Sequence, residues 1–144
     1  MNRPYVICHM LVSYNNKISG GFMFAPEAAG QIAEYGRIDR EFNARAWLCG
    51  KNTMEEFIGV RRPDCCTDTT ECQKTDFVAV KGVSQYVVVT DPDGTLGYEK
   101  PYLEKGGRKS YVIALLTNRA GAAYAACLRK TGISYLFAGE KELD

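Results

Sequence analysis

The sequence predicts an α/β protein with a largely parallel central sheet, and three observations lead to this expectation. Short apolar runs alternate with segments of helical periodicity along the 144 residues. One apolar run passes through Gly50 directly into a helical segment, and a strand–helix–strand pattern occupies the last third of the chain. Because a crossover helix joins parallel strands, this alternation is typical of an α/β sheet. The length predicts one domain over residues 1–144.

The first strand and the first helix are expected in the N-terminal third. Residues 4–12 are almost continuously apolar and rich in Val, Ile and Tyr, the pattern of a strand covered on both faces. A polar turn follows at residues 13–21. From Pro26 onward, apolar side chains recur at three- and four-residue steps, which predicts an amphipathic helix. These side chains are Ala28, Ile32, Tyr35, Ile38 and Phe42.

A second strand should lead through a glycine turn into a second helix. Residues 44–49 are apolar and too few for a stable helix, so they are expected to form a buried strand. Gly50 supplies backbone freedom at the turn. Thr53 and Glu56 have the spacing of a capping box, and Met54 begins an apolar face.

The middle of the chain is expected to alternate strands with loops. Residues 60–76 have no period and are expected to form a loop. A buried strand is expected at residues 85–90, ended by the strong turn signal at residues 91–94. Residues 97–107 look irregular, and residues 109–116 are expected to form a further strand.

The last third is expected to form a parallel strand–helix–strand crossover. Thr117 or Asn118 can cap an alanine-rich helix that ends near Lys130. Residues 133–138 are expected to form the next strand, paired in parallel through a right-handed connection. Residues 139–144 resemble the opening turn of another helix.

Charge and hydropathy argue against nucleic acid and membranes as partners. The chain has 18 Lys and Arg against 17 Asp and Glu, a net charge of +1. This balance offers no electrostatic attraction to nucleic acid or to an anionic membrane. No apolar run approaches the roughly 20 residues of a membrane span, and the N-terminus lacks the pattern of a signal peptide. A cytoplasmic protein is therefore expected.

The six cysteines and the single histidine do not predict a metal site. Cys8, Cys49 and Cys127 lie in apolar segments and are expected to act as small hydrophobic residues. The remaining cysteines are expected to be reduced loop residues, because their spacing is not that of a zinc knuckle. They are Cys65, Cys66 and Cys72. His9 is expected to be a hydrogen-bonded core residue rather than a catalytic base.

Two loops that follow strand ends are candidates for ligand binding. A helix that begins at Gly50 would present unpaired N–H groups to an anion such as a phosphate, and Lys51 adds a cation. An ordinary strand-to-helix corner is the alternative interpretation. The other loop, residues 13–18, holds a hydroxyl, two amides and an ammonium group that can bind a polar heterocycle or a sugar phosphate. A solvated turn is the alternative there, and this loop has no carboxylate for acid–base catalysis.

Four segments together resemble the dihydrofolate-reductase-like reductase domain of riboflavin biosynthesis. They are RPYVICHMLVSYNNKISG, AWLCGKNTMEEF, YVVVTDPDGTLGYEKP and LRKTGISYLFAGEKELD, in this order over nearly the whole chain. The resemblance implies a three-layer sandwich with a mostly parallel central sheet. It also implies an NADPH-dependent reductase acting on 5-amino-6-(5-phosphoribosylamino)uracil, a pyrimidine substrate.

The resemblance also implies roles for individual residues. The turn that meets the NADPH phosphates corresponds to Gly50, Lys51, Asn52 and Thr53. Thr90 and Asp91 correspond to positions near the adenosine part of the cofactor. The loop at the substrate and the nicotinamide corresponds to Ser13, Asn15, Lys17 and Ile18, with Asn15 and Lys17 as the catalytic candidates. The protein's task is mainly to orient the two rings and to exclude water.

Two departures from the family pattern leave the activity open. Asn15 stands where the family has an Asp, which removes a charge and its capacity for proton transfer, and Asn16 stands where the family has a Gly. The family also continues beyond residue 144 with a glycine-rich turn and the last strands of the sheet. An incomplete sheet would expose a strand edge, so a homodimer is expected. The alternatives to an active reductase are an inactive binding or structural module and a cysteine-dependent redox protein.

Overall fold

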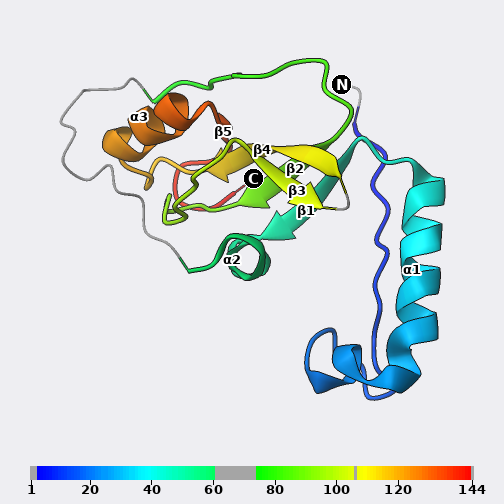
Figure 1. The fold of residues 1–144 in the computed structure, drawn as a ribbon. Coiled ribbons are helices and arrows are strands. Elements are labelled where there is room, and N and C mark those ends of the chain that lie inside the picture. Colours follow the sequence, from blue (N-terminus) through cyan, green and yellow to red (C-terminus); the bar gives the residue numbers. More distant parts are fainter. Residues whose placement is uncertain (1–2, 61–73, 106, 144) are drawn as a thin grey trace. The chain divides into compact units, whose positions relative to one another are not determined.

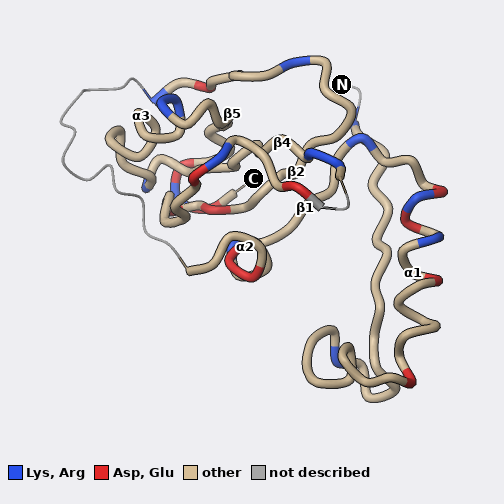
Figure 2. Tube along the Cα trace, viewed as in Figure 1, with Lys and Arg blue, Asp and Glu red and all other residues tan. Residues whose placement is uncertain are grey.

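The computed structural model describes residues 3–60, 74–105 and 107–143 (Figure 1). The chain divides into two compact units, Met1–Ala44 and Arg45–Asp144, and each is described by itself. Both signs of charge are distributed along the chain (Figure 2), in keeping with the net charge of +1. Within the described ranges, no helix has both the length and the apolar character needed to cross a membrane.

The first unit contains two short 3-10 helices and one long α-helix. The 3-10 helices η1 and η2 are Gly21–Phe24 and Pro26–Ala28, and the α-helix α1 is Ala29–Phe42. The expected amphipathic helix is therefore confirmed. It ends where Asn43 takes a left-handed conformation with a φ of 45°, which Asn tolerates better than most residues.

The strand expected at residues 4–12 is wrong. This segment has no regular secondary structure, and the side chains of Tyr5 and Val6 are 91% and 79% exposed. A strand forms only when its N–H and C=O groups pair with a neighbouring strand. Among the described residues, none of the backbone groups of this segment takes part in such a ladder. An apolar pattern shows that a segment could be buried, but it does not provide the partner.

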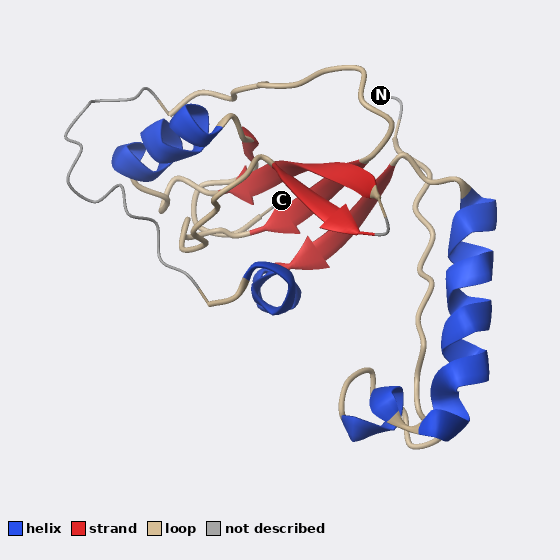
Figure 3. Cartoon of the chain, viewed as in Figure 1, coloured by secondary structure: helices blue, strands red, loops and turns tan. Residues whose placement is uncertain are grey.

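The second unit is built on a mostly parallel sheet of five strands (Figure 3). The strands are β1 (Ala46–Gly50), β2 (Tyr86–Thr90), β3 (Tyr102–Lys105), β4 (Arg108–Leu116) and β5 (Ser134–Phe137). The order is β1-β2-β4-β3, and β5 pairs with the second half of β4. Only β3 is antiparallel to its neighbour. The expected α/β class with a largely parallel sheet is confirmed.

The core of this unit lies around the two central strands. Side chains along β2 and β4 alternate between buried and partly exposed, as expected when one face of a strand packs more tightly than the other. The helices α2 (Lys51–Ile58) and α3 (Ala122–Thr131) add buried side chains to this core. The fully buried apolar residues include Met54, Val87, Val89, Leu96, Ala114, Leu116, Ala125, Ile133 and Tyr135.

Strand β3 lies in the segment that was expected to be irregular. It has four residues, and Tyr102 pairs with Tyr111 of β4 across a connection that includes Gly107, whose φ is 74°. The segment has no clear alternation of its own, so its extended conformation depends on pairing with β4. The local sequence alone was therefore not enough to predict a strand in this segment.

Two expected helix caps are wrong, and so is the helical turn expected at residues 139–144. Gly50 is the N-cap of α2, which places Thr53 in the first turn instead of at the cap. Gly121 is the N-cap of α3. Thr117 lies four residues before this cap, where its hydroxyl donates to the Pro92 carbonyl at 2.8 Å and accepts a bond from the Arg119 amide at 3.2 Å. Residues 139–143 form bends without a helix. The end of α3 agrees with expectation, since Gly132 follows it with a φ of 77°.

Candidate functional site

The carboxyl ends of β1 and β2 meet at one corner of the sheet. Gly50 and Thr90 are register partners, and each is the last residue of its strand. A side-chain carbon built on Gly50 would lie 3.8 Å from the Thr90 hydroxyl oxygen, so the two positions are in direct proximity. Helix α2 begins with the next residue, Lys51. We call Gly50, Lys51, Asn52, Thr53 and Thr90 the cofactor corner, after the NADPH contacts that the resemblance implies for these positions.

The backbone amides of this corner are accessible to an anion. No side chain of the described residues caps the N-terminus of α2. Gly50, Asn52 and Thr53 are exposed and Lys51 is half-buried, so the corner is open to solvent. The first N–H groups of a helix have no intrahelical acceptor, and together with the helix dipole they attract negative charge. Lys51 adds a cation to the same turn.

Asp91 follows Thr90 but points into the protein. Its side chain is 1% exposed. The carboxylate oxygen Oδ2 accepts hydrogen bonds from the Thr95 and Leu96 amides at 2.8 and 3.0 Å. The Thr95 hydroxyl donates to Oδ1 at 3.0 Å. All of these donors belong to the chain itself, so Asp91 organises the turn after β2, and any influence on a ligand passes through neighbouring residues.

Two tyrosines that the sequence did not mark as functional lie near Asp91. The Tyr124 hydroxyl of α3 lies 3.0 Å from Asp91 Oδ2 and 2.9 Å from the Leu96 carbonyl oxygen. The Tyr98 hydroxyl is buried and has no hydrogen-bond partner among the described residues. Burial, reinforced by the Asp91 carboxylate, holds the pKa of both phenols above the usual range. A tyrosine within an alanine-rich helical face is a signal for such a contact, because a buried phenol needs a partner for its hydroxyl.

The cysteines differ partly from expectation. Cys49 is buried as expected, and burial raises the pKa of its thiol to about 11. Cys8 is exposed, because the segment around it has no neighbouring strand to cover it. Cys127 is disulfide-bonded, so it is not the free apolar thiol that was expected. Cys65, Cys66 and Cys72 lie outside the described residues, and no cluster of metal-ligating side chains occurs in the part that the structure describes.

The second predicted loop lies in the first unit and forms a tight turn. The Ser13 hydroxyl donates to Asn15 Oδ1 at 2.7 Å and accepts a bond from the Lys17 amide at 2.9 Å. Asn16 has a φ of 60°, the left-handed conformation for which Gly or Asn is best suited. Ile18 is 59% exposed. The loop thus brings Ser13, Asn15 and Lys17 together, whereas the cofactor corner belongs to the other unit.

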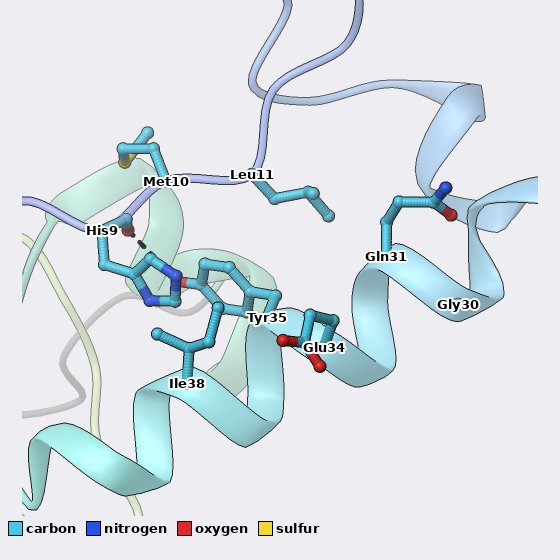
Figure 4. A pocket seen from close by; sticks show the side chains of 8 residues that line it. All are labelled: His9, Met10, Leu11, Gly30, Gln31, Glu34, Tyr35 and Ile38. Atoms are coloured by element: carbon cyan, nitrogen blue, oxygen red, sulfur yellow. Dashed lines mark hydrogen bonds between the residues drawn. The ribbon is translucent and has the colours of Figure 1, made fainter.

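The first unit also contains an open cavity of about 400 Å³ between α1 and residues 9–11 (Figure 4). Its lining residues are His9, Met10, Leu11, Gly30, Gln31, Glu34, Tyr35 and Ile38. The His9 ring stacks on Tyr35 at 4.2 Å between centroids, and the Tyr35 hydroxyl lies 3.4 Å from the His9 carbonyl oxygen. His9 Nδ1 is buried without a hydrogen-bond partner in the described ranges. His9 therefore packs by aromatic stacking on a helix, and the hydrogen-bonded core position expected for it is wrong.

The chain was compared with known protein families, with curated proteins and with solved structures. A scan against protein-family models, a search of curated proteins and a search of solved structures each found no match to the chain.

Proposed function

We propose that this chain is a cytoplasmic, NADPH-dependent reductase with a dihydrofolate-reductase-like fold. Its implied substrate is 5-amino-6-(5-phosphoribosylamino)uracil or a related pyrimidine or pterin-like compound. The observation that carries the proposal is the cofactor corner, an uncapped helix N-terminus beside Lys51 and Thr90 at the carboxyl edge of a parallel sheet. Ligands of open α/β sheets collect at this edge.

The corner offers separate groups to the phosphates and to the adenosine part of a dinucleotide. The amides of residues 51–53 suit the phosphates, and the Lys51 ammonium group can pair with the same charge. Thr90, on the neighbouring strand, offers a hydroxyl toward the adenosine part. When bound, NADPH would supply a hydride. The residues of the corner would hold the phosphates and so set the position of the rest of the cofactor.

The loop at residues 13–18 is proposed to bind the substrate. Its Ser13 hydroxyl and Asn15 amide form a preorganised turn, and the Lys17 ammonium can pair with an anionic substrate. Asn15 can hydrogen-bond a heterocycle but cannot transfer a proton. The proposed contribution of this loop is therefore orientation by hydrogen bonding.

A titration with NADPH tests the proposal. We expect binding to quench the intrinsic fluorescence and to raise the melting temperature. Lys51→Ala should weaken binding about 10- to 100-fold, since a charge-assisted hydrogen bond is worth on the order of 1.5–3 kcal/mol. Lys81→Ala is the matched control, an exposed lysine in the same unit but outside the corner. No response of the unmodified chain at millimolar NADPH would remove the proposal.

An inactive binding module is the second candidate. The observation that favours it is Asn15, whose side-chain oxygen already accepts a bond from Ser13 within the turn. This candidate predicts NADPH binding without NADPH oxidation in the presence of the pyrimidine substrate. An absorbance assay for NADPH oxidation separates the two candidates.

We also propose that the chain forms a homodimer through β1. The outer side of β5 is covered, because Phe77 and Tyr135 exchange two backbone hydrogen bonds of 2.9 Å. Strand β1 pairs with β2 alone among the described strands, and its Leu48 is 67% exposed. An open strand edge with exposed apolar side chains promotes association.

Light scattering at micromolar concentration should therefore report the mass of a dimer. Leu48→Lys should shift the chain to a monomer, because it places a charge on the associating strand. Val78→Lys, which changes a 50% exposed residue of the segment beside β5, should leave the mass unchanged. A monomer mass for the unmodified chain would contradict the dimer.

A further inference from the structure

The turn after β2 is clamped between the end of β4 and helix α3. On the β4 side, the Asp91 amide donates to the Leu115 carbonyl at 3.0 Å. The Thr117 amide and hydroxyl both donate to the Pro92 carbonyl, at 3.1 and 2.8 Å. On the α3 side, the Tyr124 hydroxyl reaches Asp91, as described above. The turn is thus attached to two elements that follow it in the sequence.

The contact with α3 is closely packed as well as hydrogen-bonded. Gly94 has a φ of +66°, and a side-chain carbon built on it would lie 2.4 Å from Cδ1 of Tyr124. The turn therefore lies against the tyrosine ring at a distance that only glycine allows. Tyr124 is 5% exposed, so its ring is packed in the core and is not a surface side chain.

We infer that Tyr124 is a positioning residue for the cofactor corner. Its hydroxyl holds the Asp91 carboxylate, Asp91 holds the backbone of residues 95–96, and together they fix the chain at Thr90, the residue directly before Asp91. Thr90 faces Gly50 across β1 and β2. Helix α3 contributes no residue to the cofactor corner, but through these contacts it sets the position of the Thr90 side chain. This inference rests on the proposed function for the identity of the ligand.

The effect of Tyr124 can be separated from general stability. Tyr124→Phe removes one hydroxyl and keeps the ring against Gly94. Asp91 would still accept the Thr95 and Leu96 amides, so the turn should shift locally while the sheet stays folded. The matched control is Tyr111→Phe, a half-buried tyrosine of β4 whose ring lies 5.6 Å from that of Tyr102.

The experiment measures backbone NMR shifts and ligand affinities of the full chain and both variants. We expect Tyr124→Phe, but not Tyr111→Phe, to shift the amide resonances of Gly50 and Thr90. We also expect it to weaken NADPH binding about fivefold and to leave the binding of reduced nicotinamide mononucleotide, which lacks the adenosine part, unchanged. A merely structural role would weaken both ligands equally. Should Tyr124→Phe fail to fold, Thr95→Ala replaces it, since that variant removes the 3.0 Å bond to Asp91 Oδ1.

The outcomes separate this inference from the proposed function. Unchanged Gly50 and Thr90 resonances would overturn the inference, as would shifted resonances with unaltered NADPH affinity. If the unmodified chain does not bind NADPH, the proposed cofactor is overturned. If Tyr124→Phe still shifts the Gly50 and Thr90 resonances in that case, the positioning role of Tyr124 is supported.

Discussion

Asp91→Ala should lower the free energy of unfolding by about 3–5 kcal/mol. The carboxylate is 1% exposed and accepts hydrogen bonds from two backbone amides and two hydroxyl groups. Its removal would leave the Thr95 and Leu96 amides and the Thr95 hydroxyl without this acceptor, and an unsatisfied buried donor costs about 1–3 kcal/mol. The Leu96 amide is the most severely affected, since its bond is buried, whereas the Tyr124 hydroxyl keeps the Leu96 carbonyl oxygen as an acceptor. Urea denaturation followed by circular dichroism measures the change.

Asp93→Ala is the matched control for this variant. Asp93 lies two residues further along the same turn and forms a 2.9 Å ion pair with Arg119, but both side chains are about half exposed. An exposed ion pair is worth about 0–1 kcal/mol, so the urea concentration at the midpoint of unfolding should change little. Asp91→Asn should cause a loss of stability between those of Asp91→Ala and Asp93→Ala, because an amide oxygen still accepts hydrogen bonds. Equal losses for Asp91→Ala and Asp93→Ala would show that the carboxylate does not organise the turn.

Gly94→Ala should lower the free energy of unfolding by about 2–5 kcal/mol. The left-handed backbone accounts for about 1–2 kcal/mol of this, because the φ of +66° disfavours a side-chain carbon. Overpacking adds about 1–3 kcal/mol, because the new methyl group would overlap the Tyr124 ring, whose Cδ1 is 2.4 Å away. The ring cannot withdraw freely, since its hydroxyl is held near Asp91 and Leu96. Thermal or urea denaturation measures the loss.

Gly82→Ala separates the two contributions. Gly82 has a φ of +70°, close to that of Gly94, but no atom lies within 4 Å of its side-chain position. Its replacement should therefore cost only the backbone contribution of about 1–2 kcal/mol. The difference between the variants measures the packing of the turn on α3. If both alanines destabilise the chain equally, Tyr124 does not press on the turn, and the positioning role loses its basis.

Most elements of the second unit could be predicted from the sequence. Strands β2 and β4 agree with expectation within one residue, because each contains an apolar run that is followed by polar residues. The end of α3 was predictable for the same reason, since Gly132 follows Lys130 closely. These signals are local, so they do not depend on which strand becomes a neighbour.

The failures concern features that depend on a distant partner. Residues 4–12 have a strand pattern but no ladder, whereas β3 has a weak pattern and a good partner in β4. Thr117 has the chemistry of a helix cap, but its hydroxyl donates to the Pro92 carbonyl and accepts the Arg119 amide, and α3 begins later, at Ala122. In each case a backbone or side-chain group has several possible partners, and the sequence alone does not rank them.

The same division holds for the candidate site. The amino-acid sequence by itself determined that a strand passes into a helix at Gly50 and Lys51. An apolar run, a glycine and a helical period occur there within a few neighbouring residues. The sequence also located the turn that follows Thr90. Only the tertiary structure decided that Asp91 points inward and that Tyr124 meets it from α3. The physical reason is that a buried carboxylate must be satisfied by donors, and its donors here include one that folding brings from another helix.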